Sequence, residues 1–281
     1  MTTTELKSTR IEAAIDKAVA GGGMADLLDA LDRGSNLPGT RPNLDLARAV
    51  GVALASRRGK ADAIVRSLLG EPQKEYPVIV AAHALAQRAV AGVDARGALA
   101  DLHELAGDAR HLIRLGVSSA LRSFIAAGGE AAVRELATWT DGYLHAHVVL
   151  EALADRELLA RLPSGEEVLA RLEEAFRLAD DSPRSAERSQ GLRSLRGSLP
   201  AQIAVIAARF PEAVAWVQAR TASKRPETRE VVDQAIIALR KTGLRNAEAA
   251  RLHQALDASA KPPRDPSRIV QGTRKRSKGR K

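Results

Sequence analysis

The absence of cysteine from this 281-residue chain excludes disulfides, thiolate metal sites and cysteine nucleophiles. Alanine, leucine and arginine are abundant and only 2% of the residues are aromatic, which favours helices over strands and predicts an all-α fold. No apolar run reaches the roughly 20 residues of a membrane span and the N-terminus has no signal-peptide core, so we expect a cytoplasmic protein that does not enter a membrane.

The first 42 residues predict two helices and a loop. The helices are expected over residues 4–20 and 24–32, and the glycines and prolines of residues 34–42 indicate the loop. Asn43 then suits the N-cap of the next helix. We therefore treat residues 1–42 as an N-terminal segment that precedes the main body.

Residues 43–260 predict a succession of helix pairs. Ser198 is expected to cap a new helix with Pro200 in its first turn, where a missing N–H costs little. The other helices are predicted over residues 44–57, 61–69, 76–91, 95–105, 110–127, 130–140, 144–162, 166–178, 212–220, 227–241 and 246–258. Residues 261–281 contain three prolines and almost no apolar residue, so we expect a disordered basic tail.

A five-residue pattern recurs in this region: a small residue, two variable positions, alanine and leucine. It is found at Val50–Leu54, Ala81–Leu85, Val117–Leu121, Val149–Leu153 and Ala235–Leu239, with a weaker copy at Gly191–Leu195. The first three intervals between its leucines are 31, 36 and 32 residues. Such a period is typical of an array of helical repeats, which commonly binds partners along its concave surface.

One unit resembles the HEAT repeat family. Asp108 is followed by Arg114, then by Val117, Ala120 and Leu121, which is similar to the family's Asp turn, Arg and ladder of small residues. In such repeats the Asp and the Arg commonly tie adjacent turns together. The resemblance implies a right-handed α-solenoid of about six HEAT-like helix pairs over residues 43–260.

The last third resembles a narrower group, the bacterial DNA alkylation repair proteins, which include alkylpurine DNA glycosylases. The similarity is carried by Leu195–Val217, with Ile203, Ile206 and Pro211, and by Pro226–Gly243, which ends in an Ala-Leu-Arg run and a Lys-x-Gly turn. It implies a basic face that holds duplex DNA and presents a carboxylate to a damaged nucleotide.

This chain lacks acidic residues at two positions where that family has them. The chain has Val205 and Ala120 where the family places acidic residues. Asp141 and Glu151 remain as candidate acids, and Trp139 as a candidate stacking residue beside Asp141. We therefore expect a DNA-binding protein rather than an enzyme; any catalysis would be hydrolysis of the N-glycosidic bond of an alkylated purine.

Positive charge collects toward the C-terminus. Residues 184–245 have twelve basic and five acidic residues and residues 261–281 have nine and one, whereas the rest of the chain carries a net charge of −6. This asymmetry favours a polyanionic partner at the basic end. The candidate nucleic-acid ligands are Arg188, Arg193, Arg196, Lys224, Arg225, Arg229, Arg240, Lys241, Arg274, Lys275, Arg276, Lys278, Arg280 and Lys281.

Metal and cofactor sites are not expected. His145 and His147 are two residues apart on a predicted helix and point to different sides, and His103-Glu104 is a single His-Glu pair. The loop around Gly34 and Gly39 lacks the lysine of a phosphate-binding loop.

A second class of function fits the same sequence. The chain would then be a monomeric, non-enzymatic protein–protein scaffold whose acidic front repeats bind a protein partner while the basic tail anchors it near nucleic acid. Trp139 and Trp216 are the only tryptophans, and at helical spacing such residues more often belong to the core than to a base-binding surface.

Overall fold

The computed structural model describes residues 3–260, and this part of the chain contains fourteen α-helices, three short 3-10 helices and no strand. The prediction of an all-α protein is therefore confirmed. The α-helices are α1 (Thr3–Val19), α2 (Ala25–Gly34), α3 (Leu44–Ser56), α4 (Asp62–Leu69), α5 (Glu75–Val90), α6 (Ala95–Ala106), α7 (His111–Glu135), α8 (Tyr143–Leu153), α9 (Arg156–Arg161), α10 (Glu166–Asp180), α11 (Gln190–Arg209), α12 (Pro211–Arg220), α13 (Pro226–Lys241) and α14 (Asn246–Ala258). The 3-10 helices are η1 (Arg58–Ala61), η2 (Leu136–Asp141) and η3 (Arg184–Ala186).

The structure bears differently on the predicted tail and on the expectation that the chain does not enter a membrane. The predicted tail, with its candidates Arg274, Lys275, Arg276, Lys278, Arg280 and Lys281, lies outside the described residues. Among residues 3–260, no helix combines the length and the apolar character that crossing a membrane requires.

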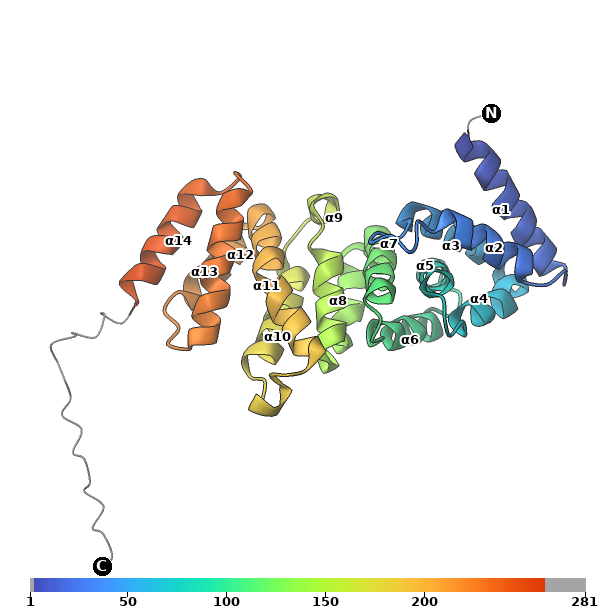
Figure 1. Cartoon of the computed structure of the whole chain (residues 1–281). Coiled ribbons are helices and arrows are strands. Elements are labelled where there is room, and N and C mark those ends of the chain that lie inside the picture. The colour runs from blue at the N-terminus through green and yellow to red at the C-terminus, as the bar shows by residue number, and fades with distance from the viewer. Residues whose placement is uncertain (1–2, 261–281) are drawn as a thin grey trace, which may run out of the picture.

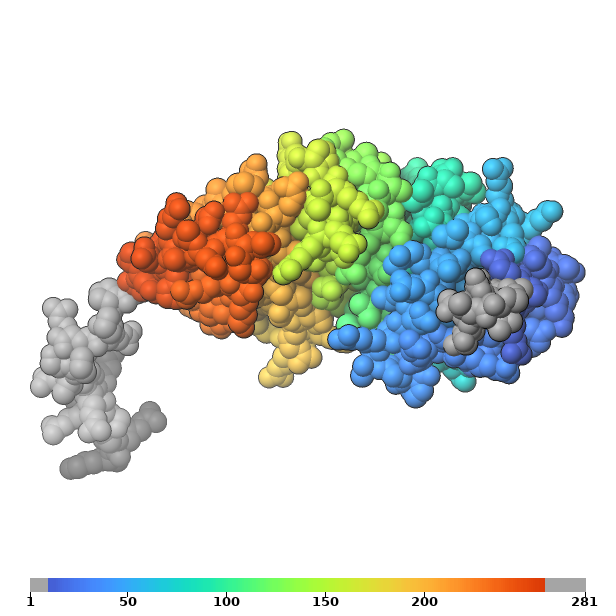
Figure 2. Space-filling view, turned by 90° about the horizontal axis from the view of Figure 1, so that it is seen from above, coloured from blue at the N-terminus to red at the C-terminus, as the bar shows by residue number. Residues whose placement is uncertain are grey.

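The helices follow one another along an elongated body (Figure 1). Figure 2 shows the same body from above, with the first helices at one end and the last at the other. Six helices pack in succession along it: α3 on α5, α5 on α7, α7 on α8, α8 on α11, and α11 on α13. Each of the six carries one copy of the five-residue pattern, so the pattern marks the helices that pack on one another in succession.

The pattern marks these helices because its residues form the core. The alanine and the leucine of the first four copies are all less than 10% exposed, from Leu54 at 0% to Ala53 at 9%. Small residues then set how closely the helices approach. A Cβ added at Gly51 of α3 would lie 2.6 Å from the Cβ of His83 and 2.8 Å from the backbone nitrogen of Ala84, both in α5. These two helices therefore meet almost backbone to backbone.

Most helix boundaries agree with the predicted ones, but the expected helix start at Ser198 is wrong. Residues Gln190–Arg209 form one helix, α11, with Pro200 inside it. The Ser198 hydroxyl donates a hydrogen bond to the carbonyl of Ser194 at 3.0 Å instead of capping a new helix. Proline removes one backbone donor from a helix, and burial of Leu199 and Ile203 against the neighbouring helices offsets that loss.

The predicted helix over residues 144–162 is divided in two. Helix α8 ends at Leu153, and Asp155 caps a separate short helix, α9, by accepting a hydrogen bond from the Leu158 N–H at 2.9 Å. Aspartate is among the residues best suited to an N-cap, so the break has a local cause.

The Asp108–Arg114 pair differs from the expected contact. The Asp108 carboxylate binds Arg110 at 2.7 Å, whereas Arg114 is 3% exposed and donates to the carbonyls of Asp108 (2.6 Å) and Ala109 (2.9 Å). Arg229 does the same near the start of α13, donating to the carbonyls of Thr221 (3.1 Å) and Leu256 (2.8 Å). Buried Arg114 and half-buried Arg229 thus close the turns before these two helices.

Candidate functional site

A pocket of about 910 Å³ lies between the end of α5, helix α6, helix α7 and η2. Its walls are largely apolar, with Val90, Leu99 and Phe124 among them, and its polar groups include His103 and Asp141. A concave, mainly apolar site with a few polar groups is the usual setting for ligand binding.

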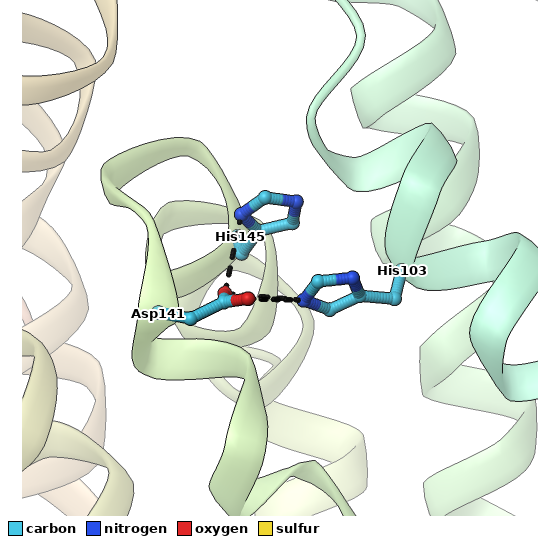
Figure 3. A group of neighbouring side chains, drawn as sticks. All are labelled: His103, Asp141 and His145. Carbon is cyan, nitrogen blue, oxygen red and sulfur yellow. Dashed lines mark hydrogen bonds and ion pairs between the residues drawn. The ribbon is translucent and has the colours of Figure 1, made fainter.

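Three side chains that could coordinate a metal ion meet beside this pocket (Figure 3), and two of them, His103 and Asp141, line it. His103 is in α6, Asp141 ends η2 and His145 lies in the first turn of α8. The Nε2 atom of His103 is 3.0 Å from Asp141 Oδ2, and the Nδ1 atom of His145 is 3.4 Å from Asp141 Oδ1. The two imidazole rings are stacked, with centroids 4.2 Å apart and planes only 4° from parallel. One carboxylate therefore faces two parallel histidines.

Two glycines leave room for the His145 ring. A Cβ at Gly142 would lie 2.5 Å from His145 Nδ1, and a Cβ at Gly107 would lie 3.0 Å from His145 Nε2. The backbone thus closes around this ring in a way that a larger residue at position 142 would prevent.

The environment keeps His145 in its neutral form. Burial lowers the pKa of this histidine, the nearby His103 lowers it further, and Asp141 raises it in part. Its Nδ1 atom is buried and makes no hydrogen bond within the described residues. A neutral imidazole with a free lone pair beside a carboxylate can accept a proton or bind a metal ion.

Trp139 supports this cluster rather than presenting a face to the solvent. It is 3% exposed, and its ring meets that of His103 edge to face, with centroids 5.1 Å apart. An indole in this position fixes the orientation of the histidine ring.

Glu151, the other candidate acid, lies elsewhere. It is two turns along α8, about 12 Å of helix from Tyr143. Its carboxylate accepts a hydrogen bond from Gln202 at 3.1 Å and lies 3.9 Å from Arg122. The structure therefore does not bring Glu151 and Asp141 together.

The histidine cluster is not apparent in the sequence. His103 is 38 residues from Asp141 in the chain, and only the packing of α6 against α7 and α8 brings them together. The i, i+4 spacing of Asp141 and His145 was the one local signal. His147, the histidine nearest to His145 in the sequence, is not part of the cluster, and its Nδ1 lies 2.9 Å from the Ser198 hydroxyl.

The basic candidates divide into two kinds. Arg196, Arg225 and Arg229 bind groups of the protein itself. Arg196 contacts Glu187 (2.8 Å) and the carbonyl of Ala179 (2.9 Å), and Arg225 contacts the carboxylate of Asp180 (2.9 Å). Arg229 has the turn-closing role described above. These three guanidinium groups therefore link helices and turns of the protein to one another.

Other candidates are exposed and have no ion-pair partner in the described part of the chain. They are Arg188, Arg193, Lys224, Arg240 and Lys241. Arg240 and Lys241 end α13, about 22 Å of helix from its start. They therefore lie apart from Lys224, which precedes that helix.

Arg188, Arg193 and Lys224 lie near the starts of α11 and α13. Arg196 in the second turn of α11 and Arg225 at the N-cap of α13 both bind the end of α10, so the N-terminal parts of these two helices are neighbours. Figure 1 shows these starts and the end of α14 along the same lower side. We call the exposed group Arg188, Arg193 and Lys224, which is near these helix starts, the basic edge.

No protein-family model matches the chain, and neither a curated protein nor a solved structure matches it.

Proposed function

We propose that this protein is a right-handed α-solenoid of about six HEAT-like helix pairs that binds duplex DNA through its phosphates, related to the bacterial DNA alkylation repair proteins. The succession α3, α5, α7, α8, α11 and α13 supports the repeat architecture, because one equivalent helix per unit packs on the next. The common turn-closing role of Arg114 and Arg229 supports it as well.

The observation that carries the binding proposal is the position of the basic edge. Ser259, at the end of α14, donates a hydrogen bond to the carbonyl of Thr221 and accepts one from Arg229 at 2.7 Å. The last described residue, Ala260, is therefore beside the start of α13. The sequence that follows it holds nine basic residues in 21, so this charge joins the chain at the basic edge. Arginine and lysine at such a surface bind phosphates without regard to sequence.

The proposal is binding without base excision. Asp141 and Glu151 belong to different surroundings, and Glu151 is engaged by Gln202 and Arg122. Trp139 packs its ring edge on His103 and has little exposed surface for a nucleobase. We expect no release of alkylated purines from duplex DNA; release that is lost in Asp141→Asn would assign the chain an enzymatic function instead.

The test is a titration of a fluorescently labelled DNA duplex with the full-length protein and with residues 1–260, at salt concentrations from about 50 to 200 mM. We expect both to bind, the truncated chain more weakly and with a smaller salt dependence. If residues 1–260 show no salt-dependent binding, the basic edge is not a DNA site. Failure of both proteins to bind would favour the scaffold function.

A further inference from the structure

We propose that His103, Asp141 and His145 form a binding site for one divalent transition-metal ion, with an open coordination position facing the pocket. This inference does not depend on nucleic-acid binding, because the three residues are outside the basic edge.

The donor atoms are spaced as a metal site requires. Zinc bound to imidazole nitrogen and carboxylate oxygen at about 2.0–2.2 Å places its ligands roughly 3.4 Å from one another in a tetrahedron. Here the Asp141 oxygens are 3.0 Å from His103 Nε2 and 3.4 Å from His145 Nδ1. All three donor atoms lie within 4.8 Å of one another. Because the two rings are stacked and nearly parallel, one imidazole must rotate before both nitrogens can point at the same ion.

The surrounding structure holds the three side chains of the site in place. Its residues come from α6, η2 and α8, three elements fixed by the core. The glycines at 107 and 142 make the space for the His145 ring, and the Trp139 edge orients His103. Independently of this geometry, the buried Nδ1 atom of His145 points toward the cluster without a hydrogen bond. A metal ion would give that nitrogen a partner.

The donor set indicates the class of ion. Two imidazoles and one carboxylate suit Zn²⁺, Co²⁺ or Fe²⁺ rather than Mg²⁺ or Ca²⁺, which take mainly oxygen ligands. Three protein ligands leave at least one position for water or a ligand, as in catalytic rather than structural zinc sites. His103 and Asp141 both line the 910 Å³ pocket, so a group bound there has direct access to the ion.

Other histidines of the chain provide matched controls. His253 pairs with Asp257 at 3.0 Å in the same i, i+4 arrangement as His145 with Asp141, but it has no second histidine. His111 is exposed at the start of α7. Loss of either leaves the proposed site intact.

The experiment measures Zn²⁺ binding to the untagged full-length protein by calorimetry, and the visible absorption of bound Co²⁺. We expect one equivalent of each ion and a Co²⁺ spectrum of low coordination number. The variants His103→Asn and Asp141→Asn change partly exposed side chains and should keep the circular dichroism of the wild type. Each should weaken Zn²⁺ binding at least about tenfold, whereas His253→Ala and His111→Ala should leave the affinity within about twofold.

Two results would overturn the proposal. One is the absence of stoichiometric Zn²⁺ and Co²⁺ binding to the folded wild-type protein. The other is an equal loss of affinity in His253→Ala and in the two site variants, because exposed histidines in general would then account for the binding. His145→Ala adds a third site variant, and a loss of Co²⁺ absorption with unchanged circular dichroism would support the assignment.

Discussion

Replacing His83 by leucine should make the protein more resistant to mild acid. His83 is fully buried in α5, where the helix meets α3, and neither ring nitrogen has a hydrogen-bond partner in the described residues. Burial and, to a smaller extent, the charge of Arg48 together lower the pKa of this histidine from 6.5 to about 4. Folding therefore requires the neutral imidazole.

The size of the effect follows from that shift. In the unfolded chain His83 takes up a proton as the pH falls through 6.5, whereas in the folded protein it resists until about pH 4. The stability contributed by the neutral form is therefore complete above pH 6.5 and decreases as the pH falls to 4. The full loss is about 3 kcal/mol, of which about 2 kcal/mol falls between pH 7 and pH 5.

The assay is urea unfolding of the wild type and His83→Leu at several pH values. The difference between their free energies of unfolding should shift by about 2 kcal/mol in favour of the variant between pH 7 and pH 5, because the other titrating groups cancel. Parallel pH profiles for the two proteins would refute the reasoning. They would mean that His83 is accessible to protons in the folded state and that α3 and α5 are not packed as described.

Three further predictions concern packing and the arginine contacts. Gly51→Ala should destabilise the protein by about 1–3 kcal/mol because its Cβ would press on α5. Gly197→Ala has open space around it and should be neutral or stabilising by up to about 1 kcal/mol. Equal effects of the two substitutions in thermal unfolding would contradict the close approach of α3 and α5. Arg229→Ala should lower the free energy of unfolding by about 1–3 kcal/mol, because it leaves carbonyls unpaired. Arg193→Ala should lower it by less than about 0.5 kcal/mol but weaken DNA binding. A larger loss of stability in Arg193→Ala than in Arg229→Ala would remove the distinction between the two arginines. Trp216→Phe should cost about 1–2 kcal/mol because the indole N–H donates to Glu173 at 2.7 Å, with no change in DNA affinity; a loss of affinity would indicate base stacking by Trp216.

Local patterns predict this fold well where the helices carry the signals themselves. The five-residue pattern identifies the six successive helices because alanine and leucine at that spacing must be buried on one side. The break at Asp155 and the unbroken course of α11 through Pro200 were missed, because an N-cap competes with helical periodicity and because tertiary packing compensates a missing backbone donor.

The candidate site depends on long-range packing, which sequence spacing does not reveal. His103 and His145 belong to different helices and become neighbours only through the packing of α6 against α8. The roles of the arginines differ for the same reason. Arg193 and Arg196 are three residues apart in the sequence, yet only Arg196 reaches the end of α10.

The most direct test of the central claim is the salt dependence of duplex DNA binding by two triple variants of the full-length protein. Arg188→Ala, Arg193→Ala and Lys224→Ala together remove three exposed charges of the basic edge. Lys60→Ala, Arg156→Ala and Arg161→Ala remove the same charge from η1 and α9.

The slope of the logarithm of the binding constant against the logarithm of salt concentration should fall by up to about 2.7 in the first variant, about 0.9 for each phosphate contact, and should stay unchanged in the second. Equal slopes in the two variants would contradict the account, because net charge and not the basic edge would then determine binding.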